Sequence, residues 1–120
     1  MRTPVVCVIA SLFLALLGTG ALRAHAFLDH ASPLVGSSVP TAPPEVSLSF
    51  TQNLEPAFSG VEVSDSAGAR VDQGKPKISG NNMRVALKSL SPGTYRVRWH
   101  VLSVDTHKTE GSFVFHVGKP

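Results

Sequence analysis

The sequence predicts an all-β protein, either an antiparallel β-sandwich or a closely related Greek-key barrel. In several short segments apolar residues recur at every second position, whereas the spacing of an amphipathic helix is absent. Groups of Gly, Pro, Asn, Asp and Ser separate these segments, as expected of tight turns. The chain contains no internal repeat and no low-complexity segment, so we expect the strands to form one domain.

The first three predicted strands alternate clearly between apolar and polar side chains. Residues 46–50 follow a pair of prolines and place two aliphatic side chains and a phenylalanine on one face, with serines on the other. Residues 61–64 place two valines on one face and end at turn-forming residues 65–68. Residues 83–88 follow the turn-forming residues 79–82 and again place three apolar side chains on one face.

The clearest strand covers residues 95–101, after a turn at 91–94. It places Tyr, Trp and two Val on one face and two Arg and a His on the other. Residues 113–117 form a last strand with two phenylalanines and a valine on one face. We therefore expect an immunoglobulin-like Greek-key sandwich or barrel of about seven strands, with Trp99 in its core.

Residues 1–24 are expected to be a secretory signal peptide. Arg2 supplies a positive charge, an apolar run covers residues 5–17, and small residues follow. The apolar run of about 13 residues is shorter than the roughly 20 residues that a membrane-spanning helix needs. We therefore expect an exported, periplasmic protein rather than a membrane-anchored one.

Two cleavage positions compete. The general rule fits Ala24-His25-Ala26 and would start the mature chain at Phe27. Cleavage after Ala24 would start it at His25 instead, which is the start that we expect from the ligand chemistry and the family resemblance given below. A mature domain of about 96 residues, 25–120, is large enough for one modest core.

The mature domain has little net charge and no cysteine. Arg2 and Arg23 lie in the signal peptide, so nine of the 11 Lys and Arg residues remain against 8 Asp and Glu. This balance and the absence of a basic cluster argue against a nucleic-acid partner. Cys7, the single cysteine, lies in the signal peptide, which excludes disulfides and thiolate metal sites from the mature chain.

The acidic side chains of Glu62, Asp65 and Asp72 are expected to be solvated.

Histidines are the natural candidates for metal ligands in a chain of this composition. Asp105 and His107 follow the aromatic strand and precede a turn expected at Gly111. In an extended segment residues two apart point the same way, so these two side chains could converge on one ion. Taken alone, this pair is more typical of a loop than of a metal site. His30 is expected to have a surface or packing role, with an auxiliary role at the metal left open.

A metal site at Asp105 and His107 is favoured if His25 is the first residue of the mature chain. A terminal histidine offers its α-amino nitrogen and its ring Nδ1 to the same ion. With the imidazole of His107 and the carboxylate of Asp105, the donors would be three nitrogens and one oxygen, which Cu(II) favours. The mature chain has Met83 as its single methionine, which disfavours Cu(I). His100 and His116 occupy strand positions opposite the aromatic face and are expected to face solvent.

Several segments resemble the CopC family of periplasmic copper-resistance proteins, in matching order and spacing over nearly all of residues 25–120. They are HAFLDHASP at 25–33, FTQNLE at 50–55, FSG at 58–60, GTYRVRW at 93–99, SVDTH at 103–107 and GSF at 111–113.

The resemblance implies a seven-stranded Greek-key barrel that binds one Cu(II) through His25, Asp105 and His107, with cleavage after Ala24. It also implies a monomeric copper carrier or buffer in copper resistance and homeostasis, not an enzyme. Its expected partner is a membrane copper transporter or a periplasmic copper oxidase. Some members of the family add a methionine-rich loop that binds Cu(I), but the corresponding stretch 64–79 contains no methionine.

Two other functions are compatible with the residues. A metal-free immunoglobulin-like binding or assembly module is favoured if the mature chain starts at Phe27. A copper oxygenase is the other, since a terminal histidine chelate also occurs in lytic polysaccharide monooxygenases. Asp105 would fill the open position that oxygen activation needs, which disfavours the oxygenase.

Overall fold

The computed structural model describes residues 26–118, so the expected signal peptide and His25 lie outside the described residues. The described part of the chain forms one short 3₁₀ helix, η2 (Pro56–Phe58), and eight strands. No helix within this part is long and apolar enough to cross a membrane. The strands are β1 (Leu28–Ser32), β2 (Ser38–Val39), β3 (Glu45–Phe50), β4 (Gly60–Asp65), β5 (Asp72–Ser79), β6 (Asn82–Leu87), β7 (Gly93–Leu102) and β8 (Lys108–Val117).

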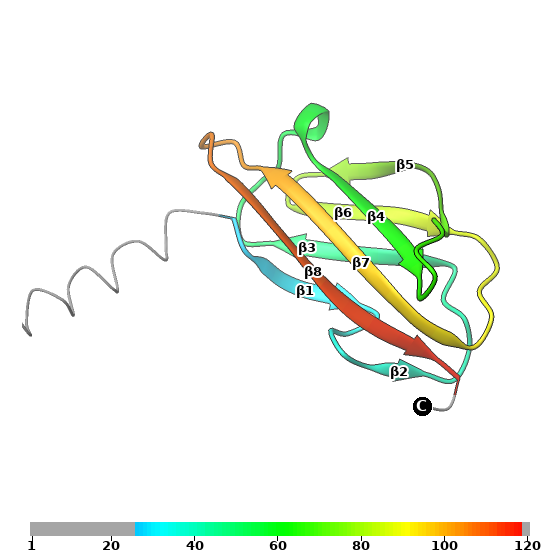
Figure 1. Cartoon of the computed structure of the whole chain (residues 1–120). Helices are drawn as coiled ribbons and strands as arrows, with labels where there is room; N and C mark the ends of the chain where they lie inside the picture. The colour runs from blue at the N-terminus through cyan, green and yellow to red at the C-terminus, as the bar shows by residue number, and fades with distance from the viewer. Residues whose placement is uncertain (1–25, 119–120) are drawn as a thin grey trace, which may run out of the picture.

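The strands form two four-stranded sheets packed face to face (Figure 1). One sheet has the order β1-β3-β6-β5 and the other the order β2-β8-β7-β4. Neighbouring strands are antiparallel except β2, which runs parallel to β8. The predicted all-β sandwich is confirmed. The strand count is eight among the described residues, rather than about seven, and includes a β2 of two residues.

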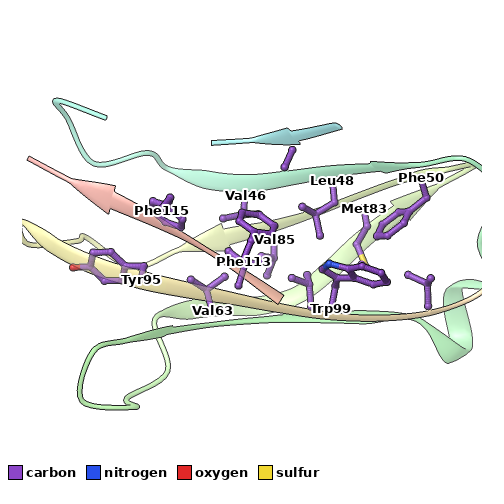
Figure 2. Close-up of a cluster of buried hydrophobic side chains, with 14 of the residues drawn as sticks. Val46, Leu48, Phe50, Val63, Met83, Val85, Tyr95, Trp99, Phe113 and Phe115 are labelled. Carbon is purple, nitrogen blue, oxygen red and sulfur yellow. The ribbon is translucent and has the colours of Figure 1, made fainter. Parts of the chain in front are cut away.

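The hydrophobic core lies between the sheets and is built from the alternating residues (Figure 2). Every second residue is buried along β3, β6 and most of β7, which is the pattern that predicted these strands. Trp99 lies in the core as expected and packs edge-to-face on Phe50, with ring centroids 5.1 Å apart. Tyr95 stacks on Phe115 with centroids 5.6 Å apart. These aromatic pairs fix the position of β7 relative to the opposite sheet and to β8.

The edge strands β1 and β5 were not predicted from the sequence. Ala31 is the only buried residue of β1, and β5 has none. Alternation arises because one face of a strand is buried, so an edge strand that buries little leaves no such pattern. Pro76 lies within β5, where the missing N–H is tolerated because the strand is at an edge.

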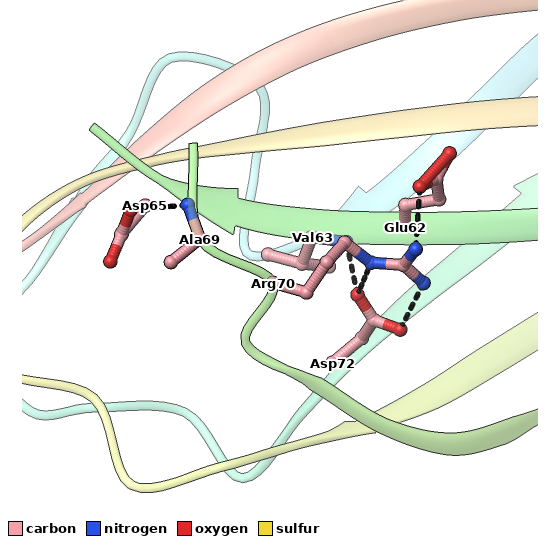
Figure 3. Close-up of polar contacts among 6 residues, drawn as sticks. All are labelled: Glu62, Val63, Asp65, Ala69, Arg70 and Asp72. Carbon is pink, nitrogen blue, oxygen red and sulfur yellow. Dashed lines mark hydrogen bonds and ion pairs between the residues drawn. The ribbon is translucent and has the colours of Figure 1, made fainter. Parts of the chain in front are cut away.

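A charged cluster ties β4 to the start of β5 (Figure 3). Arg70 donates from Nε and Nη2 to the two carboxylate oxygens of Asp72, both at 2.7 Å, and its Nη1 lies 2.8 Å from Glu62 Oε2. The backbone N–H of Val63 donates to Asp72 Oδ1 at 2.9 Å. The Asp72 side chain is 7% exposed, so the expectation that it is solvated is wrong. These hydrogen bonds, chiefly those from Arg70, hold the pKa of Asp72 below its ordinary value.

Candidate metal centre

The candidate site lies on the loop between β7 and β8, at the end of a hairpin with ten paired positions. Beyond the last pair, the Ser103 N–H donates to the His107 carbonyl at 3.0 Å, and the Thr106 N–H donates to the Ser103 carbonyl at 2.9 Å. This is the pattern of a three-residue hairpin loop that closes with one left-handed residue. Thr106, with φ of 72°, is that residue.

The loop brings Asp105 and His107 together. Asp105 Oδ1 lies 3.4 Å from His107 Nδ1, and the two side chains are 40% and 44% exposed. Nitrogen and oxygen donors lie about 2.0–2.2 Å from a divalent ion such as zinc, so two neighbouring donors on one ion lie roughly 3.0–3.5 Å apart. This distance is also that of an ion pair between the two side chains, and it shows that both side chains lie close enough together to reach one ion.

The reason for this convergence differs from the one that the sequence suggested. Asp105 and His107 lie in a tight turn and not in an extended segment. Gly111 is not a turn residue either: it lies within β8, paired with Trp99 of β7. The turn comes earlier because Thr106 adopts the left-handed conformation that sequence reasoning reserves for glycine and asparagine.

Ser103 is a functional candidate that the sequence did not reveal. It is fully buried, and its hydroxyl donates a hydrogen bond to Asp105 Oδ1. This hydrogen bond and the neighbouring His107 lower the pKa of Asp105, so the carboxylate is ionised at neutral pH. A serine between two apolar residues, Leu102 and Val104, carries no signal of this role in the sequence, because the role depends on how the turn closes.

The beginning of the described chain lies against the same hairpin. Ala26 is fully buried, and its carbonyl accepts a hydrogen bond of 2.7 Å from the hydroxyl of Thr109, two residues after His107. The next residue, Phe27, donates its N–H to Thr51 Oγ1 at 2.9 Å, and the Thr51 N–H donates to the Phe27 carbonyl at 2.9 Å. These contacts place Ala26, to which His25 is bonded, beside β8 where that strand leaves the loop.

The other histidines lie apart from this loop. His30 is exposed on β1, and His100 is exposed on β7, as expected. His116 is half-buried, and its Nδ1 lies 2.9 Å from Thr94 Oγ1 on the neighbouring strand. Within the described residues no group of three or more His, Cys, Asp or Glu side chains could hold a metal ion. The described chain therefore contributes two clustered donors at this loop, Asp105 and His107.

Comparison with known proteins identifies the family. The profile of the CopC domain matches residues 28–118. Copper resistance protein C of Xanthomonas campestris pv. juglandis is 36% identical over 126 residues, covering 98% of this chain and 94% of that protein. Copper transport protein CutJ of Bacillus subtilis is 36% identical over 100 residues, covering 80% of this chain but 18% of that much longer protein.

A solved structure agrees with these matches. The crystal structure of CopC from Methylosinus trichosporium OB3b superimposes with a TM-score of 0.73 at 34% sequence identity, covering 78% of this chain and 93% of that one. The match supports a function connected with copper over a metal-free binding module. This chain therefore belongs to the CopC family, whose members are copper-binding resistance proteins and not enzymes.

Proposed function

We propose that the protein binds one Cu(II) ion per chain through His25, Asp105 and His107, and carries or buffers copper in copper resistance and homeostasis. The observation that carries this proposal is the hydrogen bond from Thr109 to the Ala26 carbonyl, which holds the start of the described chain beside the loop. A mature chain that begins at His25 would add an α-amine and an imidazole to the Asp105–His107 pair. That set of three nitrogens and one oxygen suits Cu(II).

The donors also argue for the oxidised ion. Cu(I) prefers thioether and thiolate sulfur. Beyond residue 25 the chain has no cysteine and one methionine, Met83, which is fully buried in the core. The sulfur of Met83 could reach an ion only if the sandwich opened. We therefore expect a Cu(I) chelator to remove Cu(I) easily, while Cu(II) stays bound.

The proposed location is the periplasm, reached by export and removal of residues 1–24. The proposed partner is a membrane copper transporter, with a periplasmic copper oxidase as the alternative, and the protein itself is expected to be a monomer. The match to CutJ supports a transporter, because a region similar to this chain forms 18% of a protein named for copper transport.

The mature N-terminus provides the test. The intact mass of the exported protein should correspond to a chain that starts at His25. A variant with one extra residue before His25 should lose the chelate and weaken Cu(II) binding by more than the roughly 10- to 100-fold cost of losing an outer-sphere contact. A variant extended by one residue after Pro120 is the control and should bind as the wild type does. Unchanged affinity and spectrum in the first variant would show that the terminal amine is not a ligand.

A further inference from the structure

Among the polar residues that the structure describes, Ser103 alone is fully buried, at 0% exposure. It follows the last residue of β7 and faces Leu54 in an isolated bridge. Its hydroxyl contacts the Asp105 carboxylate on one side and lies 3.2 Å from the His107 carbonyl on the other. A buried hydroxyl thus contacts both residues of the candidate metal pair.

The turn itself does not depend on this hydroxyl. The His107 carbonyl already accepts the Ser103 N–H at 3.0 Å, and the Ser103 carbonyl accepts the Thr106 N–H at 2.9 Å. A serine hydroxyl has one proton to donate, and of its two acceptors the carboxylate of Asp105 is the charged one. The backbone therefore closes the loop, and the hydroxyl is left to act on the carboxylate.

An aspartate in an exposed turn would otherwise exchange between rotamers. The hydroxyl of Ser103 holds Asp105 Oδ1 in the orientation in which it lies 3.4 Å from His107 Nδ1. The Asp105 side chain is 40% exposed, so its carboxylate can still accept an ion. Holding a ligand in its bound orientation lowers the entropic cost of binding.

We propose that Ser103 is a positioning residue of the copper site, whose buried hydroxyl fixes the Asp105 carboxylate against the His107 imidazole. The inference rests on the proposed function, in which Asp105 and His107 bind Cu(II). Partners that orient metal ligands commonly contribute 10- to 100-fold to metal affinity. Ser103 therefore should not touch the ion, yet should influence how tightly and in what geometry the ion is held.

The test compares Ser103→Ala with Ser59→Ala. Ser59 is the matched control because its hydroxyl accepts the N–H of Leu102, next to Ser103, at 3.1 Å and the structure gives it no contact with Asp105. Ser103→Ala should weaken Cu(II) binding by about 10- to 100-fold and change the electron paramagnetic resonance spectrum of bound Cu(II). Ser59→Ala should change neither. If Ser103→Ala loses stability but keeps wild-type affinity and spectrum, the role is structural and the proposal is overturned.

A double-mutant cycle separates this proposal from the proposed function. In an Asp105→Ala background, Ser103→Ala should add no more than about a twofold further loss, because Ser103 acts through Asp105. Independent, additive losses would overturn the positioning role and leave Asp105 as a ligand. An Asp105→Ala variant with unchanged affinity would overturn the ligand assignment and the positioning role with it.

A measurement on the metal-free wild-type protein covers the case in which Ser103→Ala does not fold. The proton couplings of the Asp105 side chain in nuclear magnetic resonance spectra should correspond to one rotamer. Rotamer-averaged couplings would overturn the proposal without any variant.

Discussion

The substitution Gly111→Ala tests the packing of the β7–β8 hairpin with a single added methyl group. Gly111 pairs with Trp99, and the indole ring lies over the glycine. A Cβ at position 111 would lie 2.6 Å from Cζ2 and 2.9 Å from Cε2 of that ring. Because carbon atoms in contact lie about 3.5–4.0 Å apart, the ring would have to move by roughly 1 Å. The ring is 9% exposed and also packs on Phe50, so its movement must disturb the core.

The expected cost follows from two opposing terms. Overpacking a core costs about 1–3 kcal/mol. Replacing a glycine within a strand recovers roughly 0.5–1 kcal/mol of backbone entropy. We therefore expect a net loss of about 0–2.5 kcal/mol, with a central value of about 1 kcal/mol. In a domain of this size each kcal/mol lost lowers Tm by about 4–8 °C. Urea denaturation followed by fluorescence measures this loss, and the shift in emission reports on Trp99, the single tryptophan of the chain.

Gly93→Ala is the matched control. Gly93 also lies in the β7–β8 ladder, paired with Val117, and a Cβ there would meet nothing within 4 Å. The Gly93→Ala variant should be as stable as the wild type or more stable by up to about 1 kcal/mol. If Gly111→Ala proves as stable as Gly93→Ala, with unchanged fluorescence, the indole ring of Trp99 is not held against Gly111 and the expected overpacking does not occur.

Three further predictions concern the charged cluster, the loop and the metal pair. Asp72→Asn should cost about 1–2 kcal/mol at neutral pH, a modest value because Arg70 is 55% exposed. Folding lowers the pKa of Asp72, so its carboxylate contributes fully to the free energy of unfolding above its ordinary pKa near 3.9, and this contribution is lost as the pH falls further. In urea denaturation, acid should therefore reduce the difference in the free energy of unfolding between the variant and the wild type. Thr106→Gly should leave stability unchanged or raise it by up to about 1 kcal/mol, because it relieves a left-handed threonine, and a clear loss would contradict this. In Cu(II) titrations His107→Ala should lose far more affinity than His30→Ala, and equal losses would mean that the site is misassigned.

The contrast between β5 and β6 shows what the sequence could reveal of the fold. Along β6, Met83, Val85 and Leu87 are buried and alternate with exposed residues, so the strand is visible in the sequence. Its neighbour β5 buries no residue and contains Pro76, so nothing in its sequence distinguishes it from a loop. A strand at a sheet edge is formed by the hydrogen bonds that its neighbour offers, and these leave little trace in its own composition.

The candidate site was likewise predictable from the sequence only in part. Asp105 and His107 are two residues apart, so their types and spacing alone made them candidates. The role proposed for Ser103 depends on a turn that closes through a left-handed threonine, and nothing in the sequence predicts that conformation at Thr106. The role of Thr109 depends on a contact with Ala26, 83 residues earlier in the chain, which only the folded sandwich creates.

If the proposed copper site is correct, different residues of the β7–β8 hairpin determine the stability of the fold and the geometry of the bound metal. Below the loop, Trp99 and Gly111 pack against each other within the sandwich and make no direct contact with the metal pair that the structure records. At the loop, Ser103 contacts Asp105 through its side chain while the backbone closes the turn. Substitutions at the first pair should therefore change the free energy of unfolding without changing how folded protein binds copper. Substitution of Ser103 should instead weaken copper binding. Its cost in the free energy of unfolding should be limited to the lost hydrogen bonds of the hydroxyl, about 1–3 kcal/mol, because the backbone still closes the loop. A site built in this way can vary its ligands and their support without loss of the fold.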